Sequence, residues 1–283
     1  MRVSVFWVSL VVLLAIAGGN PASAAAKGCM HGHGRVSKKL TGGFEIRISP
    51  NRDKVDLDDP ECRAVVLDVN RKTIFAENDW GFSIEVAGSD VNGDGIPDVV
   101  LEAYSGGAHC CWTYYVISLG SKPGLIAKFE NNRDAAFFWD DGDRRIEILT
   151  RDGNFDYFDG LCHGCTPFPL VYLRLDGTTL VDISPSCVDD YDEIISQNQK
   201  ALTAPDLQHL RALKENPSDD EESRETIYKA LTIVFAYLYS GREVQARQAL
   251  QNMWPAFDQE RMWKLIEETR RDGILRYTRK QPH

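Results

Sequence analysis

The chain has 283 residues, of which 43 % are hydrophobic, 10 % aromatic and 26 % charged. This composition is typical of a globular protein and excludes a disordered or fibrous one. Acidic residues outnumber basic ones by 42 to 32, which gives a formal net charge of -10. Because a nucleic-acid surface needs clustered positive charge, the balance argues against nucleic acid as a partner.

The first 24 residues have the pattern of a secretory signal peptide. Arg2 precedes an apolar run over residues 3–17, and a small-x-small cleavage site ends at Ala24. The run is shorter than the roughly 20 apolar residues that a membrane anchor needs, and no later segment is long and apolar enough to span a bilayer. We therefore expect cleavage after Ala24 and a secreted or periplasmic protein with no membrane span.

The cysteines indicate an oxidising compartment. All seven lie after the signal segment, at positions 29, 62, 110, 111, 162, 165 and 187. In an exported protein such cysteines usually form disulfides, and an odd number leaves at least one without an intrachain partner. Spacing does not determine the pairing. We predict a bridge between Cys29 and Cys62 because both flank the first strand expected in the chain.

Three similar β units are predicted in the middle of the chain. Hairpin patterns recur at residues 65–75, 115–129 and 171–183, about 50 residues apart, a spacing typical of propellers and repeat arrays. Further strands are expected upstream of these hairpins, at residues 44–48, 82–86, 97–104, 135–139 and 145–150. Four strands per unit is the size of a propeller blade, and three units are too few for a closed ring.

The last third of the chain changes to helical periodicity. A capping-box pattern at residues 218–221 predicts a helix start, and apolar residues at helical spacing continue to Leu238 before Gly241. Two more helices are expected over residues 246–253 and from Asp258 to Gly273, with a shorter one at residues 206–214. The prediction is an α+β protein, with a β-rich repeat domain over residues 25–190, partly propeller-like, and a helical domain over residues 191–283.

One loop has the residues of a cation site. Oxygen-bearing side chains occupy positions 1, 3, 5 and 9 of residues 90–98, and glycine occupies position 6; the side chains are those of Asp90, Asn92, Asp94 and Asp98. With the main-chain carbonyl of Ile96 and water, these groups give the all-oxygen ligand set that Ca²⁺ prefers. An EF-hand is excluded because position 12 is Leu101 and strand-forming residues flank the loop. The alternative is a solvated Asn-Gly and Asp-Gly turn without a metal.

This loop resembles the calcium loops of FG-GAP and VCBS-type repeats, such as those of integrin alpha subunits. The resemblance is close over residues 90–100. It implies a Ca²⁺ ion that rigidifies a β hairpin, on a propeller-like scaffold used for adhesion or recognition of a protein or glycan ligand. Residues 139–147 align with the loop but have Trp139 at position 1 and Arg144 in the glycine position, so this second copy is expected to lack the ion.

A second group of residues allows other chemistry. Equivalent segments of the second and third units contain His109, Cys110 and Cys111, and Cys162, His163 and Cys165. Three interpretations stay open for them: structural disulfides, a zinc site, and redox catalysis.

The enzymatic interpretation has little further support in the sequence. Hydrolase elbows, metalloprotease helices and phosphate-binding glycine loops do not occur in it. A thioredoxin-like cysteine pair needs a helix amino terminus, and a strand is expected after Cys165. We predict an exported calcium-binding and disulfide-stabilised binding or structural protein. The alternative is a redox or metal-dependent enzyme that uses the His109, Cys110, Cys111, Cys162 and Cys165 cluster.

Overall fold

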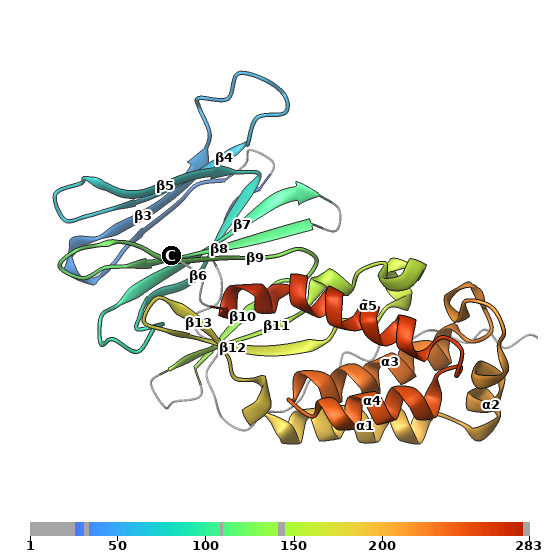
Figure 1. The fold of residues 1–283 in the computed structure, drawn as a ribbon. Coiled ribbons are helices and arrows are strands. Elements are labelled where there is room, and N and C mark those ends of the chain that lie inside the picture. The colour runs from blue at the N-terminus through green and yellow to red at the C-terminus, as the bar shows by residue number, and fades with distance from the viewer. Residues whose placement is uncertain (1–25, 31–33, 108–109, 141–144, 280–283) are drawn as a thin grey trace, which may run out of the picture.

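The computed structural model describes residues 26–30, 34–107, 110–140 and 145–279 (Figure 1). The signal segment, His109 and residues 141–144 lie outside the described residues. The fold is α+β: antiparallel sheets are followed by helices. Within the described part of the chain no sheet closes on itself, so a propeller ring is not present there.

Three antiparallel sheets correspond to the three predicted units. The first contains β2 (Val36–Lys39), β3 (Glu45–Pro50), β4 (Cys62–Leu67) and β5 (Thr73–Asp79). The middle sheet has the order β1 (Ala26–Met30), β6 (Gly81–Ser89), β7 (Asp98–Gly107), β8 (Cys110–Ser118) and β9 (Gly124–Asn131). The third contains β10 (Phe137–Asp140), β11 (Ile146–Arg151), β12 (Leu170–Asp176) and β13 (Thr179–Asp182). The sequence did not predict β1 and β2.

The middle sheet lies between the other two (Figure 1). On β7, Val99 and Leu101 belong to a buried cluster shared with the first sheet, whereas Val100 belongs to the cluster shared with the third sheet. A strand covered on both faces has no polar side to present, which explains the continuous apolar run of residues 99–101. The middle sheet is therefore the support on which the loops of the second unit are mounted.

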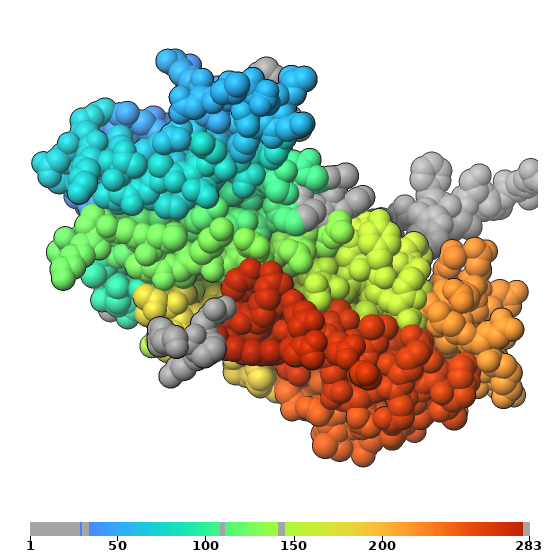
Figure 2. Space-filling model, turned by 45° about the horizontal axis from the view of Figure 1, so that its top comes forward, coloured from blue at the N-terminus to red at the C-terminus, as the bar shows by residue number. Residues whose placement is uncertain are grey.

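Five α-helices follow β13 in the described residues. They are α1 (Val188–Ala201), α2 (Ala204–Ala212), α3 (Arg224–Tyr239), α4 (Glu243–Met253) and α5 (Gln259–Asp272), and a short 3₁₀ segment, η7 (Ile274–Thr278), ends the described chain. Figure 2 shows this red C-terminal segment against the green strands of the middle sheet, in agreement with its contacts to β9 and β13. None of the helices described is long and apolar enough to cross a membrane.

The helical predictions were correct in number for the last three helices but wrong in one boundary. The capping box at residues 218–221 does not begin α3, which starts at Arg224 after Ser223. Ser218 lies in a 3₁₀ turn, and its hydroxyl donates to Asp159 Oδ2 at 2.6 Å, so a distant carboxylate replaces the predicted cap contact. The sequence did not predict α1. Gly241 ends the α3 region as expected, with a φ of 80°.

Candidate functional site

The candidate calcium loop connects β6 to β7. It begins at Asp90, directly after β6, and ends at Asp98, the first residue of β7. Gly93 and Gly95 have φ values of 78° and 82°, a left-handed conformation that favours glycine and lets the chain turn within this short span. The loop is thus mounted between two adjacent strands of the middle sheet, as the sequence predicted.

The side chains of this loop bond to its own backbone. Asp90 accepts hydrogen bonds from the amides of Gly93 at 2.8 Å, Asp94 at 3.2 Å and Gly95 at 2.7 Å. Asp94 Oδ1 accepts one from the amide of Ile96 at 2.8 Å. These contacts curl the chain around the carboxylates and hold the negative charge on the inner side of the turn.

Asp98 is the most buried member of the set. Its side chain is 0 % exposed, and Oδ2 accepts the amide of Val91 at 2.8 Å. Its other oxygen, Oδ1, is buried without a hydrogen-bond partner. Burial, together with the negative charges of Asp94 and Asp90, raises the pKa of Asp98 to about 6. A buried carboxylate oxygen with no partner is costly unless a cation or proton accompanies it.

The donor set suits a hard cation, although its side chains do not meet at one point in the structure. In the part of the chain that the structure describes, no three His, Cys, Asp or Glu side chains are grouped closely enough to hold a metal. Asp90 and Asp94 are turned toward loop amides, and two of the five expected ligands, Asn92 and Ile96, are uncharged oxygen donors. The all-oxygen chemistry and the unpartnered oxygen of Asp98 therefore fit Ca²⁺. The amide contacts of Asp90 and Asp94 leave lone pairs free on each carboxylate, because an ionised carboxylate has about four acceptor sites.

The loop also contacts the third sheet. The side-chain amide of Asn92 donates to the carbonyl of Gly177 at 3.0 Å, and the Gly177 amide donates to the Asn92 carbonyl at 3.3 Å. Gly177 lies in the turn between β12 and β13. The guanidinium of Arg145 lies next to Gly93, with Nε 3.9 Å from the position that a Cβ would take there. No sequence pattern indicates the contact between Asn92 and Gly177, because 85 residues separate them.

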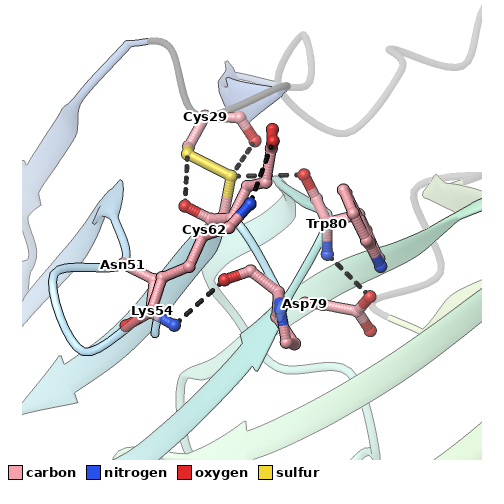
Figure 3. Close-up of a disulfide and its surroundings, with 8 residues drawn as sticks. Cys29, Asn51, Lys54, Cys62, Asp79 and Trp80 are labelled. Atoms are coloured by element: carbon pink, nitrogen blue, oxygen red, sulfur yellow. Dashed lines mark hydrogen bonds and ion pairs between the residues drawn. A yellow bond between two sulfur atoms is a disulfide. The ribbon is translucent and has the colours of Figure 1, made fainter. Parts of the chain in front are cut away.

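The predicted bridge between Cys29 and Cys62 is present (Figure 3). Cys29 lies on β1 of the middle sheet and Cys62 begins β4 of the first sheet. The expected pair is thus confirmed; the two cysteines lie on either side of β3 in the sequence, and the bridge joins two sheets. Asn51 braces the adjacent loop, since its side-chain amide donates to the carbonyl of Pro60 at 3.0 Å.

The second cysteine group also contains a disulfide. Cys162 is bonded to Cys165, and His163 between them contacts the buried Asp156 through Nδ1 at 2.8 Å. Cys111 is disulfide-bonded too, whereas His109 and the side chain of Cys110 lie outside the description. A cysteine ligates zinc only as a thiolate, so oxidised Cys111, Cys162 and Cys165 do not form the zinc cluster considered from the sequence.

Cys187 is the free cysteine among the described residues. Burial and neighbouring negative charge, that of Glu147 first, raise the pKa of its thiol to about 11. A thiol with this pKa has little thiolate at neutral pH and is a poor nucleophile. The odd cysteine is therefore consistent with a half-buried structural position directly before α1.

Comparison of the chain with protein-family models, with curated proteins and with solved structures finds no match.

Proposed function

We propose that this protein is an exported calcium-binding and disulfide-stabilised binding or structural protein of FG-GAP/VCBS type, without catalytic activity. Its three β units would form a partial, propeller-like scaffold for a protein or glycan ligand. The observation that supports the proposal most strongly is the buried Asp98 oxygen without a partner, inside a loop of oxygen donors. Such a group is stabilised by a cation at short range.

The proposed ligands are the side chains of Asp90, Asn92, Asp94 and Asp98 with the carbonyl of Ile96. When bound, Ca²⁺ supplies positive charge that offsets the negative charge of the three carboxylates. Asn92 has a second role in this arrangement. Its amide nitrogen contacts the carbonyl of Gly177 at 3.0 Å, so fixing its oxygen would also fix the turn of the third sheet. Calcium would thereby order the contact between the middle and third sheets.

Thermal unfolding in Ca²⁺ and in a chelator tests the proposal. Extracellular calcium modules have dissociation constants of roughly 0.1–1 mM, so about 10 mM Ca²⁺ should stabilise the folded protein by ~1–3 kcal/mol. For a domain of this size that shifts the Tm upward by several degrees. Asp94→Asn should lose this shift, and Mg²⁺ at the same concentration should produce much less of it, because Mg²⁺ dehydrates reluctantly.

Asp58→Asn is the matched control. Asp58 is exposed on the β3–β4 loop, and its replacement removes the same charge without touching residues 90–98. It should keep the full response to Ca²⁺. A wild-type Tm that does not respond to Ca²⁺, or an Asp94→Asn response equal to that of Asp58→Asn, would contradict the proposal that residues 90–98 bind Ca²⁺.

The enzymatic alternative has weaker support. A metal site built from His109, Cys110, Cys111, Cys162 and Cys165 needs thiolates, and a dithiol redox site needs a cysteine whose pKa is lowered. Three of these cysteines are disulfide-bonded. The Cys162–Cys165 pair also lies in a 3₁₀ turn that leads into β12, without the helix that would lower a thiol pKa.

A further inference from the structure

A cavity of about 260 Å³ lies where the helices meet the end of β13. Its lining comes from β13, α3, α4, α5 and the segment that follows α5; the residues are Asp182, Leu238, Glu243, Glu267, Arg270, Arg271, Leu275, Thr278 and Arg279. This volume is below the roughly 300–1,000 Å³ of sites for drug-sized ligands, so the cavity suits a small molecule. It is separate from the calcium loop in sequence and in chemistry.

The lining has charges of both signs in equal number. Three carboxylates, those of Asp182, Glu243 and Glu267, face the same cavity as three guanidinium groups. Among the described residues, no ion pair joins any of these carboxylates to any of the lining arginines. Arg271 pairs outward with Asp272, at 2.9 Å from Nε to Oδ1.

Two buried leucines form the apolar part of the lining. Leu238 and Leu275 are 2 % and 6 % exposed, and both line the cavity. Arg270 lies half-buried beside them, with its guanidinium 5.3 Å from the centre of the Tyr239 ring. The Nε of Arg270 is buried without a hydrogen-bond partner. A buried donor of a charged group without a partner is unfavourable unless an acceptor reaches it.

These features distinguish between classes of ligand. Arginines alone would suit an anion such as phosphate, because guanidinium groups bind oxyanions through paired N–H donors. Three carboxylates on the same cavity repel a multiply charged anion, and three arginines repel a cation. A small molecule with one charge of each sign satisfies both groups, and an apolar part would cover the two leucines.

We propose that this cavity binds a small zwitterion, namely a free α-amino acid with an apolar side chain. The ligand carboxylate lies at Arg270 and Arg279, its ammonium lies at Glu243 and Glu267, and its side chain lies over Leu238 and Leu275. The proposal does not depend on calcium, because none of residues 90–98 lines the cavity.

Isothermal titration of the full mature chain with three matched compounds tests this assignment. L-Leucine has both charges, 4-methylpentanoate lacks the ammonium, and 3-methylbutylamine lacks the carboxylate. Removing either charge leaves protein groups of one sign unpaired in the cavity. We expect L-leucine to bind and each analogue to bind at least ~10-fold more weakly, a difference of about 1.4 kcal/mol.

Variants on α5 and after η7 locate the site. Glu267→Gln and Arg279→Gln should each weaken L-leucine binding by ~10-fold or more. The controls remove equivalent charges from α5 outside the cavity: Glu268→Gln beside Glu267, and Lys264→Gln, whose side chain is 77 % exposed. Both controls should bind as the wild type does. Circular dichroism and the Tm of each variant confirm that it is folded.

Several results would overturn the proposal. If 4-methylpentanoate binds as tightly as L-leucine, the cavity is an anion site; if 3-methylbutylamine does, it is a cation site. Absence of heat and of any Tm shift with about 10 mM L-leucine on the folded wild type would show that the cavity takes no zwitterion. Equal losses in Glu267→Gln and Glu268→Gln would place any binding elsewhere.

Discussion

The phenol of Tyr239 donates a hydrogen bond to Asp152 Oδ2 at 2.6 Å, and both side chains are buried. Asp152 follows β11 and Tyr239 ends α3, so this contact joins the third sheet to the helices. Asp152 Oδ1 also accepts the amides of Asn154 at 3.1 Å and Ile274 at 3.3 Å. One carboxylate thus ties together three segments separated by up to 122 residues.

Replacing Tyr239 by Phe should measure this connection. The change removes one donor from a buried carboxylate, whose pKa is already raised by burial, and keeps the ring in place. We expect a loss of about 1.5–3 kcal/mol in the free energy of unfolding, because hydrogen bonds to buried charged groups have this magnitude. Urea denaturation measures it. Tyr228→Phe, on an exposed residue of the same helix, is the control and should change stability by less than ~0.5 kcal/mol.

Gly273 allows a second test of the junction between the third sheet and the helices, which is centred on Asp152. A Cβ at Gly273 would overlap the carboxylate of Asp152, which cannot move without breaking its three hydrogen bonds. Gly273→Ala should therefore destabilise the protein by ~2 kcal/mol or more. Gly164→Ala is the control, since nothing lies within 4 Å of the added methyl group and its backbone is not left-handed. Equal Tm values for the two variants would show that the junction is loose.

Much of the architecture was predictable because local patterns determine it. Apolar runs around polar turns predicted the strands from β3 to β13, and helical spacing predicted α3, α4 and α5. The pattern could not predict β1, which is ordered by pairing with β6 and by the distant Cys62. The wrong start of α3 has a similar cause: Ser218 bonds to Asp159, 59 residues away, and leaves its expected cap position.

The residues of the candidate loop were predictable from the sequence, but the burial of Asp98 and the contacts of the loop with the third sheet were not. The spacing of Asp90, Asn92, Asp94 and Asp98 identifies donor types, whereas burial of Asp98 depends on packing between strands. The contact of Asn92 with Gly177 depends on how the second and third sheets stack. For the mixed-charge cavity no motif exists, since its residues come from separate elements between Asp182 and Arg279.

Asp98 should give the stability of the metal-free protein a characteristic pH dependence. Its pKa is about 6 in the folded state, against an ordinary value of 3.8. Between these two values the folded state binds more protons than the unfolded state. The free energy of unfolding in chelator should therefore fall as pH rises from about 4 to about 6, with a contribution from Asp98 of ~2 kcal/mol.

Urea denaturation of wild type and Asp98→Asn across this pH range isolates that contribution. The variant lacks the titrating carboxyl, so the difference between the two curves should change over this window and level off above it. Ca²⁺ binds the ionised form, so its apparent affinity for the wild type should rise through the same window. A constant difference between the two curves would show that Asp98 does not titrate as its burial requires.

The Cys29–Cys62 and Cys162–Cys165 disulfides should differ in their contribution to stability. Cys29 and Cys62 are separated by 33 residues and join two sheets, whereas Cys162 and Cys165 are separated by 3. In the chain-entropy model, a longer closed loop restricts the unfolded state more. Replacing both cysteines by Ala should cost about 4 kcal/mol for the first pair and about 2 kcal/mol for the second.

Parallel urea denaturation of the two double variants checks the order. Each double variant keeps the other of these two bridges and loses two thiols, so the two variants can be compared directly. A larger loss for the Cys162 and Cys165 pair would show that loop closure is not the main effect there. The additional loss would then have a structural cause, because the short bridge positions His163 against the buried Asp156, at 2.8 Å from Nδ1 to Oδ1. His163→Ala with all cysteines intact would reproduce that excess loss if the His163 contact causes it, and would leave stability near the wild type if it does not.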